Sequence, residues 1–514
     1  MDTPPLRIHA GPSKSATEGR QNAILLTCYM TGSTEGKNLG TAGYSYDFVA
    51  RLFHPLLSRW GEVIPVPDPS THLETAVSDA RARGLNPIHV SFLPFQDVYL
   101  AKTAPNVVVP AWEFPDVPDH AFADNFQNDW PAMADQCDLV VVGGPFTVQA
   151  LRRGGTRSPI RVVPVPTPDR YFQASPWEPT NATTVDCTGY LFPLPNQLAS
   201  SDPTAVVPKP SAVYDLKQAG KSLERSVRRV IKSVLGRSFY SKLARPLQSA
   251  WNKARQRLLR HESEPSKVVL PYRSQSPLSL SGVVYTSIFN PDDGRKNWQD
   301  LLTGFLLALG DREDATLVVK LITRRAESAE RLIRFYRGRD IPHRCKLIFV
   351  CDFMSDEQMR QLVDASTFYL QTTKAEGNCL PLMNYLAAGR PGISPSHSAI
   401  SDYFDSKVGF VVDSHPEPAA WPHDPGLRLR TSWGRLVWPS LYQQLRASYE
   451  LATQDAKGYA EMADRCRTRM QNWASYEAVE SRLDQAFSDL TENRLQTEEP
   501  TTAFSERQVM RKAA

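Results

Sequence analysis

The sequence QTTKAEGNCLPLMNYLAAGRPGISPSHSAISDYF, residues 371–404, is the most informative part of the chain. A short apolar strand over 367–371 leads into two threonines, and a loop with residues 376–379 follows. The apolar pattern then predicts a helix over 381–389. Pro381 suits the first turn of that helix, because the N–H group that proline lacks would have no partner there. The stretch therefore predicts a strand, a loop and a helix in close succession.

The tip of this helix favours an anion. The free N–H groups of its first turn and the helix dipole both attract negative charge, so a diphosphate fits there. Gly377 allows the backbone to approach a ligand closely. Glu376 is placed so that its carboxylate can accept hydrogen bonds from hydroxyl groups.

The same alternation of strand and helix occurs in both halves of the chain. Runs of apolar residues without strict alternation suit strands that are buried on both faces of a parallel sheet. We expect strands at 23–29, 62–66, 88–93, 106–110, 138–142 and 160–165, and again at 282–289, 315–321, 346–351, 367–371, 391–394 and 408–412. Helices are expected at 47–61, 297–309, 326–337, 355–365 and 381–389. The pattern predicts two doubly wound α/β domains with the ligand site in the cleft between them.

Charge is distributed unevenly along the 514 residues. The net charge is only +4, but the segment 205–261 holds 14 Lys and Arg and two acidic residues, which leaves the rest at −8. Apolar residues recur in this segment at helical spacing, so a pair of basic amphipathic helices is expected. No run of eighteen apolar residues and no apolar leader is found, so neither a membrane span nor a secretory signal is expected.

Several enzyme classes lack their motifs in this sequence. We find no GxGxxG before a helix, no HExxH and no GxSxG, which argues against nicotinamide-dependent enzymes, zinc proteases and α/β-hydrolases. No two aspartates are separated by a single residue, so a DxD metal site is absent. The seven cysteines are scattered without a CxxC pair, so no disulfide framework is expected and a reducing cytosol is the default.

Residues 371–404 resemble the donor-site signature of retaining GT-B glycosyltransferases, specifically glycosyltransferase family 4. The family pattern is E-G-F-G-L-P-x-L-E-A-M-A-x-G-x-P-V-I. The matching residues here are Glu376, Gly377, Leu380, Pro381, Ala387, Gly389, Pro391 and Ile393. The resemblance assigns Glu376 to the donor sugar. It assigns the backbone of Gly377, Asn378, Cys379 and Leu380 to sugar and phosphate oxygens.

One position departs from the family pattern. The second glutamate of the family, which binds the ribose of the nucleotide, is replaced by Asn384. Asparagine can still hydrogen-bond a diol, but it carries no charge. We expect altered nucleotide affinity. An inactive relative that only binds the sugar nucleotide is the alternative.

Two further segments extend the resemblance in the second half. Arg295 and Lys296 follow the first strand of that half, where the family places cations on the diphosphate, and Lys320 is a weaker third cation. Such cations would stabilise a departing diphosphate without a metal. The loop with Phe353 and Met354 resembles the family's nucleobase loop, although a surface helix capped by Ser355 is equally compatible with these residues.

The first half is less specific. Gly40 and Gly43 lie in a glycine-rich loop that resembles the loop near donor and acceptor in the family, and Glu113 lies in a segment that resembles the acceptor side. A flexible surface loop and an ordinary structural glutamate are the alternatives.

The predicted fold is α/β of the GT-B type, with two Rossmann-like domains facing across a cleft. The expected order is a disordered N-terminus (1–22), an acceptor domain (23–172, joined by a returning helix at 472–490), an irregular linker with the basic insertion (173–280), a donor-binding domain (281–471) and a mobile tail (491–514).

The predicted function is the retaining, metal-independent transfer of a sugar from a nucleotide diphosphate sugar to an acceptor hydroxyl on a glycan or lipid-linked glycan. No cofactor beyond the donor substrate is expected. The expected location is the cytoplasm, with segment 205–261 on an anionic membrane surface. Nucleic acid is the second candidate partner for this segment, and plain solvation of its charges is the third possibility.

Overall fold

The computed structural model describes residues 22–29, 42–122, 125–179, 182–192, 274–323, 326–420 and 429–497. Gly40, the basic segment 205–261 and the predicted disordered N-terminus up to residue 21 lie outside these ranges. The predictions made for them therefore remain predictions.

The first half of the chain forms a parallel sheet of six strands in the order β2-β1-β3-β4-β5-β6. All six predicted strands are present: β1 (Asn22–Thr27), β2 (Gly61–Pro65), β3 (Asn86–Ser91), β4 (Asn106–Val108), β5 (Leu139–Val142) and β6 (Ile160–Val162). The connecting helices are α1 (Ala42–Trp60), α2 (Pro69–Ala82), α3 (Trp130–Ala134), α4 (Pro145–Arg153) and α5 (Asp169–Phe172), with 3-10 turns η1 (Phe95–Asp97) and η2 (Phe126–Asn128).

Strand β1 shows why this sheet is covered on both faces. Ile24 and Leu26 pack with the apolar face of α1, whereas Ala23 and Leu25 pack with α2. Successive side chains of a strand point to opposite faces, so a run of apolar residues needs a helix on each side.

The second half forms a sheet of eight strands in the order β16-β15-β14-β11-β12-β13-β8-β9. Its six parallel strands are the predicted ones: β11 (Val283–Phe289), β12 (Ala315–Leu321), β13 (Lys346–Val350), β14 (Phe368–Leu370), β15 (Gly392–Pro395) and β16 (Gly409–Val412). Its helices are α8 (Trp298–Leu309), α9 (Ala326–Arg339), α10 (Asp356–Asp364), α11 (Leu380–Ala387), α12 (Trp438–Gln454) and α13 (Ala456–Ala474), with turns η3 (Gly294–Lys296) and η4 (Ser398–Asp402).

The segment 173–280 is not an irregular linker throughout, which corrects the sequence interpretation. Strands β8 (Gly189–Leu191) and β9 (Ser274–Gln275) extend the second sheet by antiparallel pairing, and β7 (Thr183–Val185) pairs with β10 (Leu278–Leu280). The stretch around β7 and β8 is rich in Pro, Ser and Thr, which is typical of loops, and this is why the sequence did not reveal the strands.

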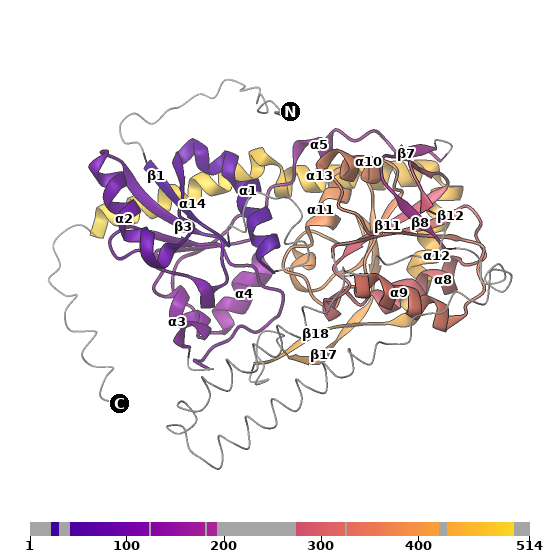
Figure 1. Cartoon of the computed structure of the whole chain (residues 1–514), viewed down its shortest axis with the longest axis horizontal. Coiled ribbons are helices and arrows are strands. Elements are labelled where there is room, and N and C mark those ends of the chain that lie inside the picture. Colours follow the sequence, from indigo (N-terminus) through magenta and orange to yellow (C-terminus); the bar gives the residue numbers. More distant parts are fainter. Residues whose placement is uncertain are drawn as a thin grey trace, which may run out of the picture.

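The two domains lie side by side and are tied together at opposite edges (Figure 1). Along one edge, α13 and α14 (Tyr476–Thr497) cross from the second domain to the first. Val479, Leu483 and Phe487 of α14 are buried in the same cluster as β1 and α1. Helix α14 continues to Thr497, so residues 491–497 of the expected tail are helical, and residues 498–514 lie outside the described residues.

At the other edge, a hairpin of β17 (Ser414–Ala420) and β18 (Arg430–Leu436) extends from the second domain toward the first. This hairpin was not predicted from the sequence. The two sheets direct the carboxyl ends of their strands toward each other, and the loops that leave these ends meet in the candidate site.

Candidate functional site

Two loops of the second domain are joined by hydrogen bonds. One is the turn after β11, with Arg295 and Lys296, and the other is residues 371–379 after β14, which we call the motif loop. The N–H of Lys374 donates to the carbonyl of Arg295 (2.7 Å), and the Thr372 hydroxyl donates to the carbonyl of Asn297 (3.0 Å). Because β11 and β14 are neighbours in the sheet, these loops emerge side by side.

Lys296 and Glu376 form an ion pair in this site. The Lys296 ammonium lies 2.5 Å from Oε1 of Glu376, and the Glu376 side chain is only 7% exposed. The backbone N–H of Glu376 donates to Oγ of Ser398 at 2.9 Å, which fixes the position of the residue. The predicted sugar-binding carboxylate and a predicted diphosphate-binding cation are therefore in direct contact.

Arg295 connects this pair to the first domain. Its guanidinium donates to the carbonyl of Ala375 (2.7 Å) and to Asp293 (2.8 Å), and its Nε lies 3.3 Å from Glu113. Burial opposes the charge of Arg295, but the carboxylates of Glu113 and Asp293 outweigh it, so its pKa is raised above the ordinary value. The structure thus brings together Glu113, Arg295, Lys296 and Glu376, which the sequence singled out from both halves.

The tip of α11 has the form that the sequence predicted. Cys379 precedes the helix with φ of 54° and makes no capping hydrogen bond through its side chain, which leaves the first-turn N–H groups uncapped by it. Pro381 lies within the first turn. Beside the tip, Gln371 accepts a hydrogen bond from the Cys379 thiol, while the Gln371 side-chain nitrogen is buried without a partner among the described residues. Burial raises the pKa of Cys379 to about 12, so its thiol stays neutral.

The motif loop lies directly against the first domain. A Cβ on Gly377 would stand 3.3 Å from the backbone oxygen of Trp112, and a Cβ on Gly143 would stand 2.2 Å from the side-chain oxygen of Asn378. A side chain at residue 377 would require the Trp112 backbone to shift by a few tenths of an ångström, whereas one at residue 143 would displace the Asn378 side chain. The two glycines therefore mark the place where the facing loops approach most closely.

Left-handed backbone conformations are concentrated in these loops. Of the four non-glycine residues with positive φ in the described ranges, Asn297, Cys379 and Ser398 belong to the three loops around the site. A positive φ at a non-glycine residue carries strain, and such strain is typical of functional sites, where surrounding contacts maintain it.

A second contact between the domains involves Asp402, which the sequence analysis missed. Its carboxylate accepts the N–H of Phe146 in the first turn of α4 (3.1 and 3.2 Å) and lies against Gly144. Burial raises the pKa of Asp402 to about 6, although the Phe146 hydrogen bond lowers it. The paired glycines 143–144 after the predicted strand at 138–142 were the available sequence signal for a close approach.

Asp402→Asn is expected to raise the melting temperature at pH 7.5. The folded carboxyl group binds its proton more tightly than the unfolded one (pKa about 6 against 3.8), so Asp402 lowers stability as the pH rises from about 4 to 6, and the loss persists above 6. Asparagine can accept the same hydrogen bond without a charge. After discounting for partial exposure, we expect about 1 kcal/mol, or about 2–4 °C.

Thermal unfolding of Asp402→Asn at pH 4.5 and pH 7.5 tests this expectation, with the exposed Asp79→Asn as control. The increase in melting temperature should be present at pH 7.5 and smaller at pH 4.5. The control should leave the melting temperature unchanged at both pH values. A lower melting temperature at pH 7.5 would contradict the proposed effect of burial.

The remaining predicted residues lie at varied positions. Asn384 is partly exposed in the second turn of α11. Lys320, at the end of β12, is 4% exposed and its ammonium donates to the carbonyl of Leu321 (2.8 Å); burial lowers its pKa to about 8. Phe353 is 42% exposed, whereas Met354 is buried in the core, so only its backbone is available to a ligand. Gly43 lies in the first turn of α1 against Tyr29.

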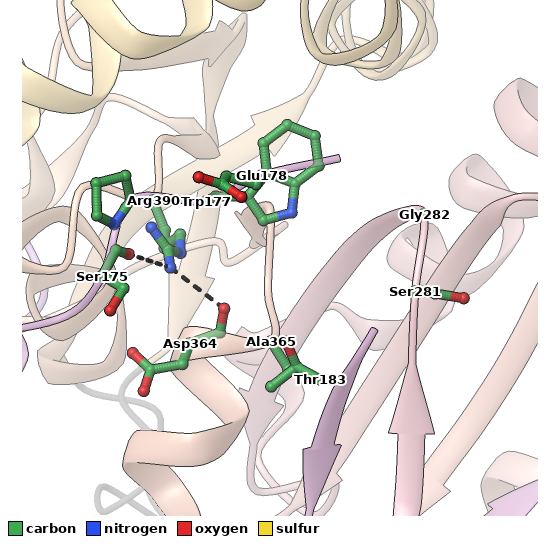
Figure 2. A pocket seen from close by; sticks show the side chains of 10 residues that line it. Ser175, Trp177, Glu178, Thr183, Ser281, Gly282, Asp364, Ala365 and Arg390 are labelled. Carbon is green, nitrogen blue, oxygen red and sulfur yellow. Dashed lines mark hydrogen bonds between the residues drawn. The ribbon is translucent and has the colours of Figure 1, made fainter. Parts of the chain in front are cut away.

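A cavity of about 220 Å³ lies elsewhere, lined by the residues before β11, β14 and β15 (Figure 2). Arg390 in its wall is 1% exposed and donates to the carbonyls of Ser175 (2.9 Å), Val363 (3.3 Å), Asp364 (3.2 Å) and Ala388 (3.2 Å). These bonds attach the chain after α5 to the second domain, so Arg390 has a structural role, at the opposite edge of the sheet from the motif loop.

Two kinds of feature are absent from the described residues. No described helix is long and apolar enough to span a membrane. The described side chains also contain no group of three or more His, Cys, Asp or Glu residues arranged to hold a metal ion.

No family model matches the sequence, and no curated protein matches it. Solved structures do resemble it. Sucrose-phosphate synthase from Thermosynechococcus elongatus is similar at 12% identity and a TM-score of 0.50, over 92% of this chain and 100% of that chain. A glycosyltransferase from Rickettsia africae is similar at 9% identity and a TM-score of 0.49, over 92% of this chain and 99% of that chain.

HepE from Anabaena, in a crystal with UDP and glucose, is similar at 11% identity and a TM-score of 0.45, over 91% of this chain and 100% of that chain. At identities this low, structural likeness demonstrates the fold alone. The match to sucrose-phosphate synthase, together with the two facing sheets, confirms the predicted GT-B fold with two Rossmann-like domains.

Proposed function

We propose that this protein is a glycosyltransferase that transfers a sugar from a nucleotide diphosphate sugar to an acceptor hydroxyl. The observation that carries the proposal is the Lys296–Glu376 pair (2.5 Å) in the loops beside the uncapped tip of α11. The pair and the helix tip offer a cation, a carboxylate and N–H groups of the first helical turn. These are the groups that a sugar diphosphate needs at its phosphates and its hydroxyls.

Donor binding would exchange the partners of this pair. Without substrate, Lys296 and Glu376 neutralise each other, and Arg295 is held by Glu113 and Asp293. We propose that a donor phosphate replaces Glu376 as the partner of Lys296, while sugar hydroxyls replace Lys296 as the partner of Glu376. Both charged side chains then keep a partner. A buried charge without a partner would be unfavourable.

In this proposal the reaction needs no metal. As the bond between the sugar and the diphosphate breaks, negative charge develops on the diphosphate, where Lys296, Arg295 and the tip of α11 stabilise it. We further propose that the sugar keeps its anomeric configuration, as in the family that the motif resembles. A departing phosphate oxygen would then accept the proton of the acceptor hydroxyl on the same face.

The surrounding residues would define the substrates. Asn384 would hydrogen-bond the ribose through its side-chain amide, and the loop with Phe353 would lie against the nucleobase. Lys320 would add a third positive charge. Glu113 would face the acceptor, which we propose to be a glycan or lipid-linked glycan. If Asn384 weakens the nucleotide site too far for turnover, the protein would only bind sugar nucleotides, and this is our second candidate function.

A thermal-shift screen tests the proposal. Several UDP-, GDP-, ADP- and dTDP-sugars are each added to the full-length protein, and release of the nucleoside diphosphate is then measured with and without glycan acceptors. A donor at one hundred times its Kd stabilises a folded protein by about 2.7 kcal/mol, so one nucleotide should raise the melting temperature clearly. Binding without turnover would favour the second candidate. The absence of any shift across several sugars and all four bases would refute both.

The basic segment 205–261 supports a separate proposal about location. Each Lys or Arg near an anionic membrane surface contributes about 1 kcal/mol, so part of its 14 cations would hold the protein there. We expect co-sedimentation with phosphatidylserine vesicles, and loss of it on deletion of 205–261. Salt-sensitive binding to RNA but not to vesicles would favour nucleic acid instead.

A further inference from the structure

The β17–β18 hairpin holds the motif loop through both backbone and side chain. The N–H of Gly434 in β18 donates to the carbonyl of Lys374 (2.8 Å). The Lys374 ammonium donates to Oε1 of Glu417 in β17 (2.9 Å) and lies 4.5 Å from the ring centre of Trp433. Lys374 is two residues before Glu376, so these contacts fix the approach of the chain to the proposed catalytic carboxylate.

Glu417 is the centre of this arrangement. Its Oε1 accepts hydrogen bonds from both Lys374 and the indole N–H of Trp433 (2.7 Å). Hydrogen bonding by Lys374 is the main reason why the pKa of Glu417 lies below its usual value. The Lys374 charge is thereby neutralised by the hairpin and does not compete with Lys296 for Glu376.

The same hairpin also contacts the first domain. Leu429, just before β18, is 5% exposed and is buried in a cluster with Trp112 and Phe114, and Trp433 packs against this cluster. The Thr431 hydroxyl donates to Asp116 at 3.0 Å. Residues 112–116 include Glu113, the partner of Arg295. One hairpin thus contacts the motif loop on one side and the acceptor-side segment on the other.

We propose that the β17–β18 hairpin couples closure of the two domains to the geometry of the motif loop, with Glu417 and Trp433 as positioning residues. When the first domain closes, Thr431 and Leu429 engage the acceptor-side segment, and the rigid two-stranded ladder transmits this position to Lys374. The motif loop then presents both Glu376 and Lys296 to the donor only in the closed arrangement. The catalytic part of this inference rests on the proposed function.

Three variants of the full-length protein separate the steps of this coupling. Glu417→Gln weakens the bond to Lys374, Trp433→Phe removes the indole donor but keeps an aromatic ring, and Thr431→Val breaks the contact with Asp116 without touching the motif loop. His415→Gln, exposed on β17, is the matched control. Hydrogen exchange of residues 371–379 is measured without substrate, so this readout does not depend on turnover.

We expect exchange of the motif loop about tenfold faster in Glu417→Gln, because the hydrogen bond from Lys374 loses its ionised acceptor there, and a smaller increase in Thr431→Val. In a transfer assay, kcat should fall about tenfold while the donor KM changes less than twofold. Unchanged exchange of residues 371–379 in all three variants would overturn the inference. If exchange responds but the wild type neither binds nor turns over a sugar nucleotide, the coupling stands and only the proposed function fails.

Discussion

Glu376→Gln is expected to lower kcat/KM for sugar transfer by about a thousandfold while the protein remains folded. The substitution keeps the shape of the side chain but removes its negative charge. The carboxylate would accept hydrogen bonds from the donor sugar and would lie near the charge that develops in the transition state. Loss of one preorganised electrostatic contact of this kind typically reduces turnover by about 10²–10³. The additional loss of charge-assisted bonds to the substrate accounts for the upper end of this range.

The substitution also has an expected effect on the product. In Glu376→Gln, Lys296 loses its ionised partner at 2.5 Å and becomes available to a phosphate. We therefore expect the nucleoside diphosphate to bind at least as tightly as in the wild type, although transfer is lost. Calorimetry with the diphosphate and a transfer assay measure the two effects. The control is Glu461→Gln, at an exposed residue of α13. Transfer at the wild-type rate would exclude Glu376 from the reaction.

Arg390→Met is expected to destabilise the second domain by about 3 kcal/mol. The guanidinium is 1% exposed and donates to four carbonyl groups from three segments of the chain. Methionine fills much of the volume but leaves the carbonyls of Ser175 and Asp364 without this donor, at about 1–3 kcal/mol for each buried group that stays unpaired. The carbonyls of Val363 and Ala388 keep the N–H of Ser366 and the guanidinium of Arg467. The relief of burying a charge offsets part of this loss, since burial already lowers the pKa of Arg390.

A loss of this size corresponds to a decrease of about 6–12 °C in melting temperature for a domain of roughly 200 residues. Differential scanning calorimetry measures this decrease. The matched control is Arg344→Met, because the Arg344 side chain is 71% exposed and pairs only loosely with Glu313. If Arg390→Met melted within 2 °C of the wild type, the four hydrogen bonds would not contribute as described.

The twelve parallel strands could be predicted from the sequence because each contains a continuous apolar run, as is typical of strands covered on both faces. This holds even for β2, which is only partly buried at the edge of the first sheet. Hairpin β17–β18 could not be predicted from the sequence in this way. Strand β17 contains Pro416 and Pro418, and proline normally excludes a segment from a sheet. The structure accommodates both because β17 pairs with β18 alone, so N–H groups on its other edge need no partner strand.

The site shows a similar division. The residues of the motif loop were evident from a local pattern, and so were the neighbouring cations. The contact of Asp402 with Phe146 joins residues 256 positions apart, and no local pattern encodes such a pair. The engagement of Arg295 with Glu113 was also not visible, although each residue was singled out separately. Which partner a charged side chain selects depends on how the two domains meet.

The crossing of α14 back to the first domain has a consequence for biosynthesis. Val479, Leu483 and Phe487 complete an apolar face of the first sheet, yet roughly 300 residues separate them from β6, the last strand of that sheet. At a translation rate of about 5–20 residues per second, the ribosome needs about 15–60 s to make the intervening chain. Throughout that interval the nascent first domain exposes an apolar surface, which makes it a natural client for chaperones that bind unfinished polypeptides.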